Sequence, residues 1–356
     1  MSVSIESDPV YERFHFLVNA PALFNAVVSA VELNVFSNLS VRPGATAEEL
    51  RTATGLPAHQ LRVLLQAVCS TGLVVREGSG YVNSPVAQEL LASDAPDSWA
   101  HILPGWKSVY YPAFMHMTRA LRTGRNTALD DHPGTEPTLY GRLPRNPELE
   151  AVFHRAMSAF TLRSVDSLIG RREFSGVRHL LDVGGGDGST SLKLAARYPE
   201  LISTVFDIPS ISKMAADKTD ADAEEQGTAA GISERVRLQA GDIFADPFPS
   251  GVDAVLFSHV LEIFSEEQIL VLLKKAYDAL PVGGQVFAYG FNVSDDETEG
   301  VFSARLGLYF NVLVSGRGMA YPAKDYERWL REVGFAGVRT VSGLPYEHGL
   351  SLGIKE

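Results

Sequence analysis

The sequence predicts an α/β protein in which a doubly wound, Rossmann-like domain follows a mainly helical, winged-helix domain. The first observation is an apolar segment, 179–183, that leads through a glycine-rich turn into a helical pattern from Ser189. The second is a series of apolar segments that end in polar residues, at 203–209, 236–244, 254–261 and 285–292. The third is helical spacing of apolar residues over 12–40, followed by a winged-helix pattern over 45–84.

Residues 1–97 are expected to form the helical and winged-helix domain. Pro21 is expected to begin a helix, because proline suits the first helical turn and lacks the N–H that a helix interior needs. Thr46 and Glu49 have the spacing of a capping box and predict the start of a short helix. A hairpin with its turn at 77–80 completes the winged-helix pattern.

A winged helix can also bind DNA, so a DNA-binding regulator is a remote alternative function. The second helix of the pattern, 57–71, offers only His59 and Arg62 as possible base-reading side chains. A formal net charge of −12 argues against a partner that presents a phosphate backbone. No nucleic-acid partner is therefore expected.

The composition is that of an ordinary globular protein. The 356 residues are enough for two domains, and 45% are hydrophobic while 21% are charged. The single cysteine, Cys69, excludes an intramolecular disulfide and suits a reducing compartment. No apolar run approaches the length of about 18 residues that crosses a membrane, and the N-terminal residues lack the basic start of a signal peptide. We therefore expect a cytoplasmic protein with no membrane partner.

Two further regions follow the winged-helix pattern. Residues 98–170 are expected to be a helical linker region that lines the pocket for the substrate. Residues 171–356 are expected to form the Rossmann-like domain. Within that domain, an alanine-rich polar stretch at 215–231 predicts a helix and a loop.

The glycine-rich turn is the most informative segment. Its glycines, at 184, 185, 186 and 188, let the backbone adopt positive φ angles and approach a ligand closely. The helix that follows offers unpaired N–H groups at its start. A pyrophosphate site favours the spacing G-x-G-x-x-G, whereas here Ser189 takes the sixth place and the spacing is G-x-G-x-G. This version suits S-adenosylmethionine, which has a carboxylate and a sulfonium but no phosphate.

Acidic residues at the ends of the next two strands complete the predicted cofactor site. Asp207 is expected to accept hydrogen bonds from ribose hydroxyls. Asp242 is expected to accept one from the adenine amine, with Phe244 beside the ring. Ligands of open α/β sheets bind at the carboxyl ends of the strands, where these residues fall. The predicted cofactor-binding residues are Asp182, Gly184, Gly186, Asp207, Ile208, Gly241, Asp242, Ile243, Phe244 and Ser258.

Together these residues resemble the plant-type small-molecule O-methyltransferase family, which includes bacterial natural-product enzymes. The resemblance extends over nearly the whole chain. Its motifs lie at 146–157, 181–188, 206–209, 241–244, 279–284 and 329–335. It implies S-adenosyl-L-methionine as methyl donor, with S-adenosyl-L-homocysteine as product. It also implies a homodimer, built by the N-terminal domain, which closes over the partner's acceptor site.

The usual catalytic pair of that family is replaced in this chain. The family places a histidine in a His-Asp-Trp phrase after the fourth strand and a supporting glutamate at the end of the fifth. Here the phrase is replaced by Glu262, Ile263 and Phe264, and the supporting glutamate by Gly290. Glu262 and His259 are the predicted catalytic residues, and their i, i+3 spacing predicts that both lie on one helix face. No third ligand at a suitable spacing accompanies them, so no metal is expected.

Three reactions stay open at this point. Glu262 could act as the base or as an anchor for a hydroxyl or amine, although a carboxyl with a pKa of about 4.3 is a poor base for a phenol of about 10 unless burial raises it. Alternatively, the acceptor is a ring carbon ortho to a phenol or amine, which we slightly favour. Thirdly, the protein binds the donor and catalyses a pericyclic reaction or a hydroxylation. The main expectation is a methyltransferase acting on a small phenolic or amino-aromatic natural-product precursor.

Candidates for the acceptor pocket are mainly aromatic. Aromatic and methionine walls with a few polar groups suit a planar acceptor. Asn311 is the strongest candidate, because a polar side chain in an apolar run needs a partner. The predicted substrate-binding residues are Trp106, Tyr110, His154, Met157, Phe160, Tyr309 and Asn311.

Overall fold

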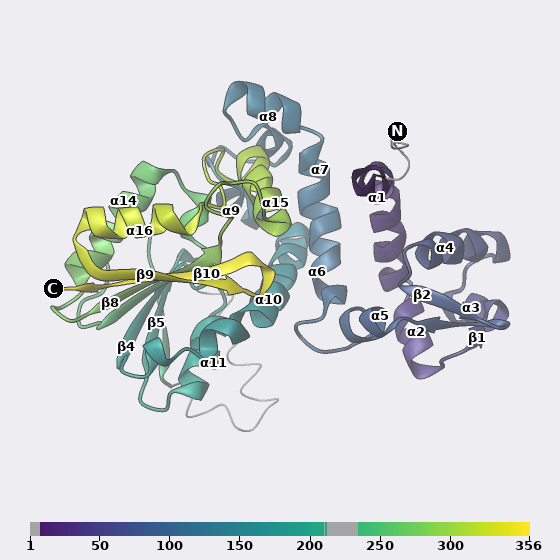
Figure 1. Cartoon of the computed structure of the whole chain (residues 1–356), viewed down its shortest axis with the longest axis horizontal. Coiled ribbons are helices and arrows are strands. Elements are labelled where there is room, and N and C mark those ends of the chain that lie inside the picture. The colour runs from purple at the N-terminus through teal and green to yellow at the C-terminus, as the bar shows by residue number, and fades with distance from the viewer. Residues whose placement is uncertain (1–7, 210, 212–233) are drawn as a thin grey trace. The chain divides into compact units, whose positions relative to one another are not determined.

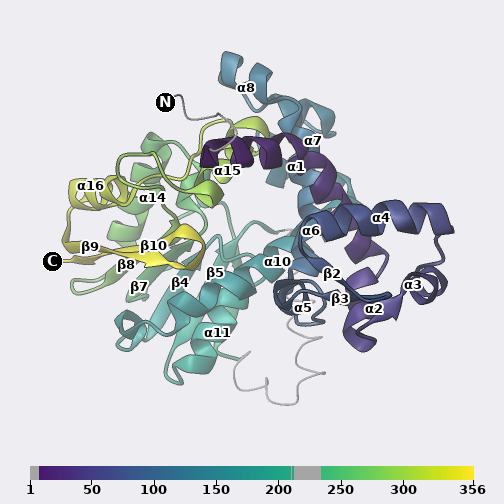
Figure 2. The ribbon, with the colours of Figure 1, turned by 45° about the vertical axis from the view of Figure 1, so that its right-hand side comes forward.

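Figures 1 and 2 show a computed structural model of the protein from two directions. It describes residues 8–209, 211 and 234–356. The helix and loop predicted at 215–231 therefore lie outside the described residues.

The chain divides into two units. The first comprises residues up to Ser108 together with Val152–Phe160, and the second comprises Val109–Ala151 and Thr161–Glu356. The region 98–170, predicted as one linker, is thus divided between the units.

The first unit combines helices with a small antiparallel sheet. Its helices are α1 (Pro9–Glu32), α2 (Val35–Val41), α3 (Ala47–Thr54), α4 (Ala58–Ser70), α5 (Pro85–Leu90) and α6 (Trp99–Gly105). Its strands are β1 (Ala45–Thr46), β2 (Val74–Glu77) and β3 (Gly80–Asn83), which pair in the order β1-β3-β2. Glu77 pairs with Gly80 across the hairpin turn, as predicted. The core of the unit is mainly aliphatic and includes Val28, Phe36, Leu39, Leu50, Leu61, Leu65 and Val68.

Of two helix starts predicted in the first unit, one is confirmed and one is wrong. The capping box is confirmed, because the Glu49 N–H donates to Thr46 Oγ1 at 3.3 Å and the Thr46 N–H donates to Glu49 Oε2 at 2.8 Å. The prediction that Pro21 begins a helix is wrong, because Pro21 lies inside α1. A proline removes one helical hydrogen bond, at the carbonyl of Leu17, and this part of α1 is exposed enough for water to replace it.

The N-terminal half of α1 carries apolar side chains on its exposed surface. They are Val10, Phe14, Phe16, Leu17 and Val18, which are 54–69% exposed. By length and composition α1 could also cross a membrane, with a mean hydropathy of 1.5 over its most apolar window. This corrects the expectation that no apolar run of such length exists.

The second unit is built on a mixed seven-stranded sheet. Its strands are β4 (His179–Val183), β5 (Ile202–Asp207), β6 (Val236–Ala240), β7 (Ala254–Ser258), β8 (Gln285–Phe291), β9 (Phe335–Leu344) and β10 (His348–Lys355). Their order is β6-β5-β4-β7-β8-β10-β9. Strands β4 to β8 pair in parallel, and β10 pairs antiparallel with both β8 and β9. The order reverses between β4 and β7, and ligands of such sheets bind at this switch point.

Helices cover both faces of this sheet. Those of the second unit are α7 (Tyr111–Phe114), α8 (Met117–Thr123), α9 (Leu139–Arg142), α11 (Ser189–Arg197), α14 (Glu266–Ala279), α15 (Val301–Tyr309) and α16 (Ala323–Val333). The long helix α10 (Pro147–Ile169) contributes to both units. In both views α14 and α16 lie on one side of the sheet and α11 on the other.

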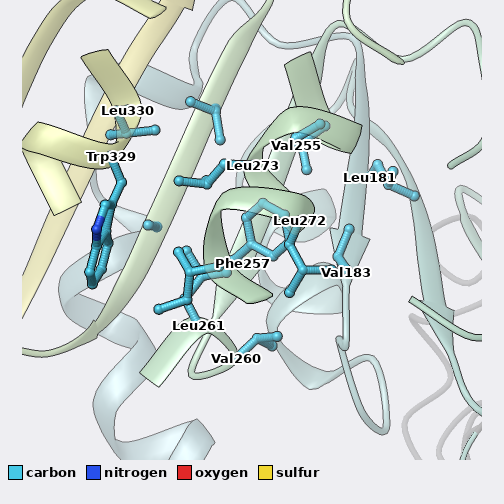
Figure 3. Packing of buried hydrophobic residues seen from close by; sticks show 14 of the residues in the cluster. Leu181, Val183, Val255, Phe257, Val260, Leu261, Leu272, Leu273, Trp329 and Leu330 are labelled. Carbon is cyan, nitrogen blue, oxygen red and sulfur yellow. The ribbon is translucent and has the colours of Figure 1, made fainter. Parts of the chain in front are cut away.

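Adjacent strand residues point to opposite faces and so build two cores. Leu181, Val255 and Phe257 pack with Leu272 of α14 and Trp329 of α16 in one cluster, part of which Figure 3 shows. The opposite cluster contains Leu180, Ala254, Leu256, Phe287 and Leu194. Because both faces are buried, the central strands are continuous apolar runs, which is why their positions could be predicted.

Candidate functional site

The glycine turn after β4 lies at the switch point of the sheet. Gly184 and Gly186 have φ angles of 68° and 60°, which an L side chain rarely adopts. A Cβ at Gly184 would lie 2.7 Å from a methyl carbon of Val260, which belongs to the loop after β7. A Cβ at Gly186 would meet no atom within 4 Å. The turn is therefore packed on one side and open on the other.

Asp207 connects this turn to the end of β5. Its Oδ2 accepts a hydrogen bond from the Gly186 N–H at 2.9 Å, and its Oδ1 accepts one from the Ile208 N–H at 2.7 Å. Burial raises the pKa of Asp207, while these two bonds lower it. Each carboxylate oxygen has a second lone pair, so Asp207 retains the capacity to accept hydrogen bonds from a ligand.

Asp182 lies under the turn and is fully buried. Its Oδ2 accepts a hydrogen bond from Ser191 Oγ at 2.7 Å, and Ser191 Oγ is in turn 2.7 Å from Ser203 Oγ. Burial raises the pKa of Asp182 to about 7. A Cβ at Gly185 would lie 2.7 Å from the Asp182 carboxyl carbon. Asp182, predicted to bind cofactor, therefore supports the turn from below.

The end of β6 brings the remaining predicted cofactor residues to the same edge. The Gly241 N–H donates to the Asp207 carbonyl at 2.9 Å. Asp242 is exposed, and its Oδ1 accepts hydrogen bonds from the N–H groups of Phe244 and Ala245 at 2.7 and 3.0 Å. The Phe244 ring is 36% exposed and packs edge-on against Phe264 at 5.0 Å. Ile243 is partly buried against the core.

These residues fit the adenosyl group of S-adenosylmethionine. The open side of Gly186 leaves room for the ligand beside the backbone. Asp207 would hold the ribose hydroxyls, and Asp242 and Phe244 would hold the adenine edge and face. The turn and the three side chains come from the ends of β4, β5 and β6, which are adjacent in the sheet.

His259, one residue past β7, is committed to a partner on β10. Its Nε2 lies 2.7 Å from Nε2 of His348, and Nδ1 of His348 lies 2.6 Å from the Pro345 carbonyl. A carbonyl only accepts, so Nδ1 of His348 carries the proton, and its Nε2 accepts a hydrogen bond from the Nε2–H of His259. Nδ1 of His259 then faces Ser258 Oγ at 3.4 Å. Burial lowers the pKa of both imidazoles, that of His348 to about 4.

The prediction that His259 and Glu262 lie on one helix face is wrong. His259 has a φ of 58°, so the chain turns there and no helix passes through it. Helical geometry begins only at a 3-10 turn, Leu261–Ile263, ahead of α14. In the described part of the chain, no group of three or more His, Cys, Asp or Glu side chains could hold a metal ion.

Glu262 is buried against the end of β8, with 2% of its surface exposed. A Cβ at Gly290 would lie 2.7 Å from Oε1 and 2.9 Å from Oε2, so the glycine leaves the room that the carboxyl occupies. Oε1 has no hydrogen-bond partner within residues 8–209, 211 and 234–356. Burial raises the pKa of Glu262 to about 8, although backbone N–H groups of Glu262 and Phe291 partly offset this. The carboxyl can therefore hold or release a proton near neutral pH.

A tyrosine cluster with one arginine lies in the same unit. The rings of Tyr110 and Tyr309 are 4.0 Å apart, and the guanidinium of Arg305 lies over Tyr110 at 5.3 Å. Tyr140, on α9, interacts electrostatically with Tyr110, Glu262 and Asp207. Tyr140 thus interacts both with the tyrosine cluster and with the carboxyl groups of Glu262 and Asp207.

Tyr140 and Arg305 were not predicted from the sequence. Arg305 is the one charged side chain in the apolar stretch 301–314, and the argument applied to Asn311 applied equally to it. Tyr140 lies in a short helix beyond a Gly/Pro-rich loop, and nothing in its local sequence distinguishes it.

The other predicted substrate-binding residues are distributed over both units. Asn311 donates from Nδ2 to the carbonyls of Gly307 and Gly318, at 2.9 and 2.7 Å, so backbone groups provide the partner that it needs. Trp106, His154, Met157 and Phe160 belong to the first unit. There Trp99 packs edge-on against both Trp106 and Phe160, at 5.2 and 6.3 Å.

Known proteins resemble this chain over most of its length. Residues 114–336 match the model of an O-methyltransferase domain, and residues 17–93 match that of an O-methyltransferase dimerisation domain. An L-tyrosine C(3)-methyltransferase of Streptomyces lavendulae is 32% identical over 91% of this chain and 86% of its own. A 3-hydroxy-5-methyl-1-naphthoate 3-O-methyltransferase of Streptomyces sahachiroi is 31% identical over 92% and 91%. The crystal structure of the S-adenosylmethionine-dependent methyltransferase SibL, in its apo form, superposes with a TM-score of 0.80 at 34% identity, covering 96% of this chain and 98% of that one.

Proposed function

Because this chain belongs to the S-adenosylmethionine-dependent O-methyltransferase family, we propose that it methylates a small phenolic or amino-aromatic natural-product precursor. The relatives support this acceptor class, since their names describe methylation of L-tyrosine and of a hydroxynaphthoate, both of which are phenols. The observation that carries the proposal is the buried Glu262 carboxyl beside Gly290.

We propose that the edge formed by β4, β5 and β6 holds the methyl donor. Bound S-adenosylmethionine supplies an electrophilic methyl group on its sulfonium. Asp207 accepts hydrogen bonds from the ribose. It also holds the glycine turn, because its Oδ2 accepts a hydrogen bond from the Gly186 N–H. The pair His259 and His348 keeps Ser258 in place beside this edge, so His259 acts in positioning.

Glu262 is the proposed proton acceptor. A free carboxyl with a pKa near 4.5 would take a proton from a phenol of pKa about 10 only against a cost of about 7 kcal/mol. With its pKa raised to about 8, the difference falls to about 2 units, or roughly 3 kcal/mol. Burial thus brings Glu262 within the range of an effective general base.

We give a slight preference to methylation at carbon. In a ring carbon ortho to a phenol or amine, the substituent's own lone pair makes the carbon nucleophilic. The enzyme then orients the ring and accepts the proton that the methylated carbon releases. A carboxylate with a pKa near 8 accepts such a proton downhill, whereas it takes a phenol proton uphill.

Mass spectrometry with methyl-labelled S-adenosylmethionine tests the proposal. The protein is incubated with labelled donor and a panel of phenols, aromatic amino acids and hydroxyaromatic acids, and products are then treated with ether-cleaving acid. A label that is lost in the acid is on oxygen, and a label that survives is on carbon or nitrogen, which the chemical shift of the labelled methyl group distinguishes. Donor binding with no labelled product from any acceptor would contradict the proposal.

We also propose that the first unit forms a homodimer. The match of residues 17–93 to a dimerisation domain and the exposed apolar side chains of α1 support it. Burying such side chains between two copies removes them from water, which is favourable. Sedimentation equilibrium should give a mass twice that of one chain.

A further inference from the structure

The hairpin turn between β9 and β10, Pro345–Glu347, has a strained backbone. Tyr346 and Glu347 have φ angles of 60° and 63°, in the left-handed region that residues other than glycine rarely adopt. Five non-glycine residues in the described part of the chain have such angles, and His259, at 58°, is another of them. His348 follows the turn and contacts His259, so three of the five meet at one place. Strained residues of this kind persist only where the surrounding structure holds them, and they cluster at functional sites.

Glu347 caps the start of α15. Its Oε2 accepts a hydrogen bond from the Ser303 N–H at 2.9 Å, and its Oε1 accepts one from the Phe302 N–H at 3.2 Å. These N–H groups lie in the first turn, where a helix offers them no partner of its own, and Gly300 at the cap position has no side chain to provide one. Although burial raises the pKa of Glu347, its hydrogen bonds to α15 lower that pKa below the usual range, so the carboxylate is ionised at neutral pH. A negative group is also favoured at the positive end of a helix.

The far end of the same helix supports the backbone that carries Glu262. Beyond α15 and the π-helical turn that extends it, Ser315 Oγ donates a hydrogen bond to the Ile263 carbonyl at 2.5 Å. A Cβ at Gly318 would overlap the carbonyl oxygen of Glu262, so the backbone there packs directly on Glu262 and Ile263. The cap at the start of α15 therefore bears on the position of Glu262 through the helix.

His348 holds the same part of the chain from its other end. It pairs with His259, and its ring stacks on that of Tyr289 at 4.9 Å with an interplanar angle of 13°. Residues 259–263 form the segment that carries Glu262, called here the Glu262 segment. Two consecutive residues, Glu347 and His348, thus hold this segment at both ends, directly at its start and through α15 at its finish.

We infer that Glu347 and His348 are positioning residues, which keep the Glu262 segment packed and hold the proposed base in its buried place. The inference rests on the proposed function, because it concerns the group proposed to accept the proton. Neither residue needs to touch the acceptor, since both act through hydrogen bonds that shape the segment. Release of the segment would let water reach the Glu262 carboxyl, and a shift of about 1 Å in a reacting group can lower turnover about 10²-fold.

Replacements of Glu347 test the inference. Glu347→Gln keeps the length of the side chain but puts an amide N–H where a carboxylate oxygen accepted a hydrogen bond, so half of the cap is lost. Glu347→Gly removes the whole cap and relieves the left-handed backbone, so it serves if Glu347→Gln does not fold. Glu297 provides the matched controls, Glu297→Gln and Glu297→Gly, because it is an exposed glutamate with a φ of 61° in another loop.

Hydrogen exchange with mass spectrometry measures the packing of the Glu262 segment without any acceptor. In the folded Glu347 variants, peptides that cover residues 259–263 and the start of α15 should exchange at least tenfold faster. Peptides that cover β4 should change less than threefold, and the Glu297 variants should change neither region. Unchanged exchange over residues 259–263 in a folded Glu347 variant overturns the inference.

The pH dependence of unfolding reports on Glu262 itself. The stability of each protein, compared with that of the same protein carrying Glu262→Gln, gives the pH range over which Glu262 titrates. Burial raises the pKa of Glu262 to about 8, so the relative stability of the unaltered protein should fall as the pH rises to about 8. In the Glu347 variants this fall should end at least one pH unit lower. Tyr140 and Tyr326 also interact with the Glu262 charge, but burial raises the pKa of both, so they stay neutral over this range.

The outcomes separate this inference from a merely structural role and from the proposed function. If Glu347 only stabilises the fold, its replacement lowers stability equally at every pH, and that result overturns the inference. Full turnover in a Glu347 variant, or a stability that shows no contribution from Glu262 between pH 5 and pH 8, also overturns it. If both readouts respond as expected but no acceptor is methylated, the proposed function fails alone.

Discussion

Replacing Glu262 by glutamine should make the protein more stable at pH 8 and less active. Folding raises the pKa of Glu262 from 4.5 to about 8, so the folded chain retains a proton that the unfolded chain releases between these pH values. Stability therefore decreases as the pH rises through this window. At about 1.36 kcal/mol per pKa unit, the cost at pH 8 is about 4 kcal/mol.

Glutamine removes this cost but introduces an amide group. Its two N–H donors would lie in a buried site, and leaving them without partners costs about 1–3 kcal/mol. The variant should therefore gain about 1–3 kcal/mol at pH 8 and lose a similar amount at pH 4. Relative to the variant, the unaltered protein should lose about 3 kcal/mol between pH 5 and pH 8.

The kinetic effect has the opposite sign. A general base contributes about 10²–10⁴-fold to rate, so turnover should fall at least tenfold, while affinity for S-adenosylhomocysteine stays within threefold. In the unaltered protein kcat/KM should rise about tenfold per pH unit below pH 8 and then level off. In the variant kcat/KM should not show this rise with pH.

Urea unfolding at several pH values and steady-state kinetics measure the two effects, with Glu332→Gln on the exposed side of α16 as control. Full activity in Glu262→Gln, or an unchanged dependence of stability on pH, would refute the assignment.

Three further changes test the site and the proposed dimer. Gly290→Ala places a methyl group 2.7 and 2.9 Å from the Glu262 oxygens, so turnover should fall at least tenfold. Calorimetry should give a nearly unchanged affinity for S-adenosylhomocysteine. Unaltered turnover would be inconsistent with the packing of Glu262 against Gly290. Asp207→Asn should weaken S-adenosylhomocysteine binding at least tenfold by calorimetry, and equal affinity would remove Asp207 from the donor site. A double replacement of Phe14 and Leu17, which are 57% and 69% exposed, by aspartate should give a monomer in sedimentation equilibrium; a persistent dimer would place the interface elsewhere.

Much of the structure around the proposed donor site could be predicted because its signals are local. The glycine turn follows β4 directly, Asp207 ends β5 and Asp242 lies two residues past β6, and strand order brings those strand ends together. That Asp182 supports the turn from below could not be predicted, because its burial under Gly185 depends on how the turn folds back over the strand.

The arrangement around β8 and β10 could not be predicted from local pattern. His259 pairs with His348, which is 89 residues away in sequence and lies on a strand that enters the sheet antiparallel to its neighbours. Helical spacing therefore gave the wrong partner for His259. Glu262 was found only through a departure from the family's motif, and its raised pKa depends on burial that the sequence does not encode locally.

The position of β10 has a consequence for how the protein is made. Strand β10 is synthesised after β9, yet it lies between β8 and β9 and supplies the backbone partners of both. Until β10 has been synthesised, β8 presents an unpaired, apolar edge of the kind that associates with other chains. Chaperones that bind exposed strand edges should therefore raise the yield of the native protein.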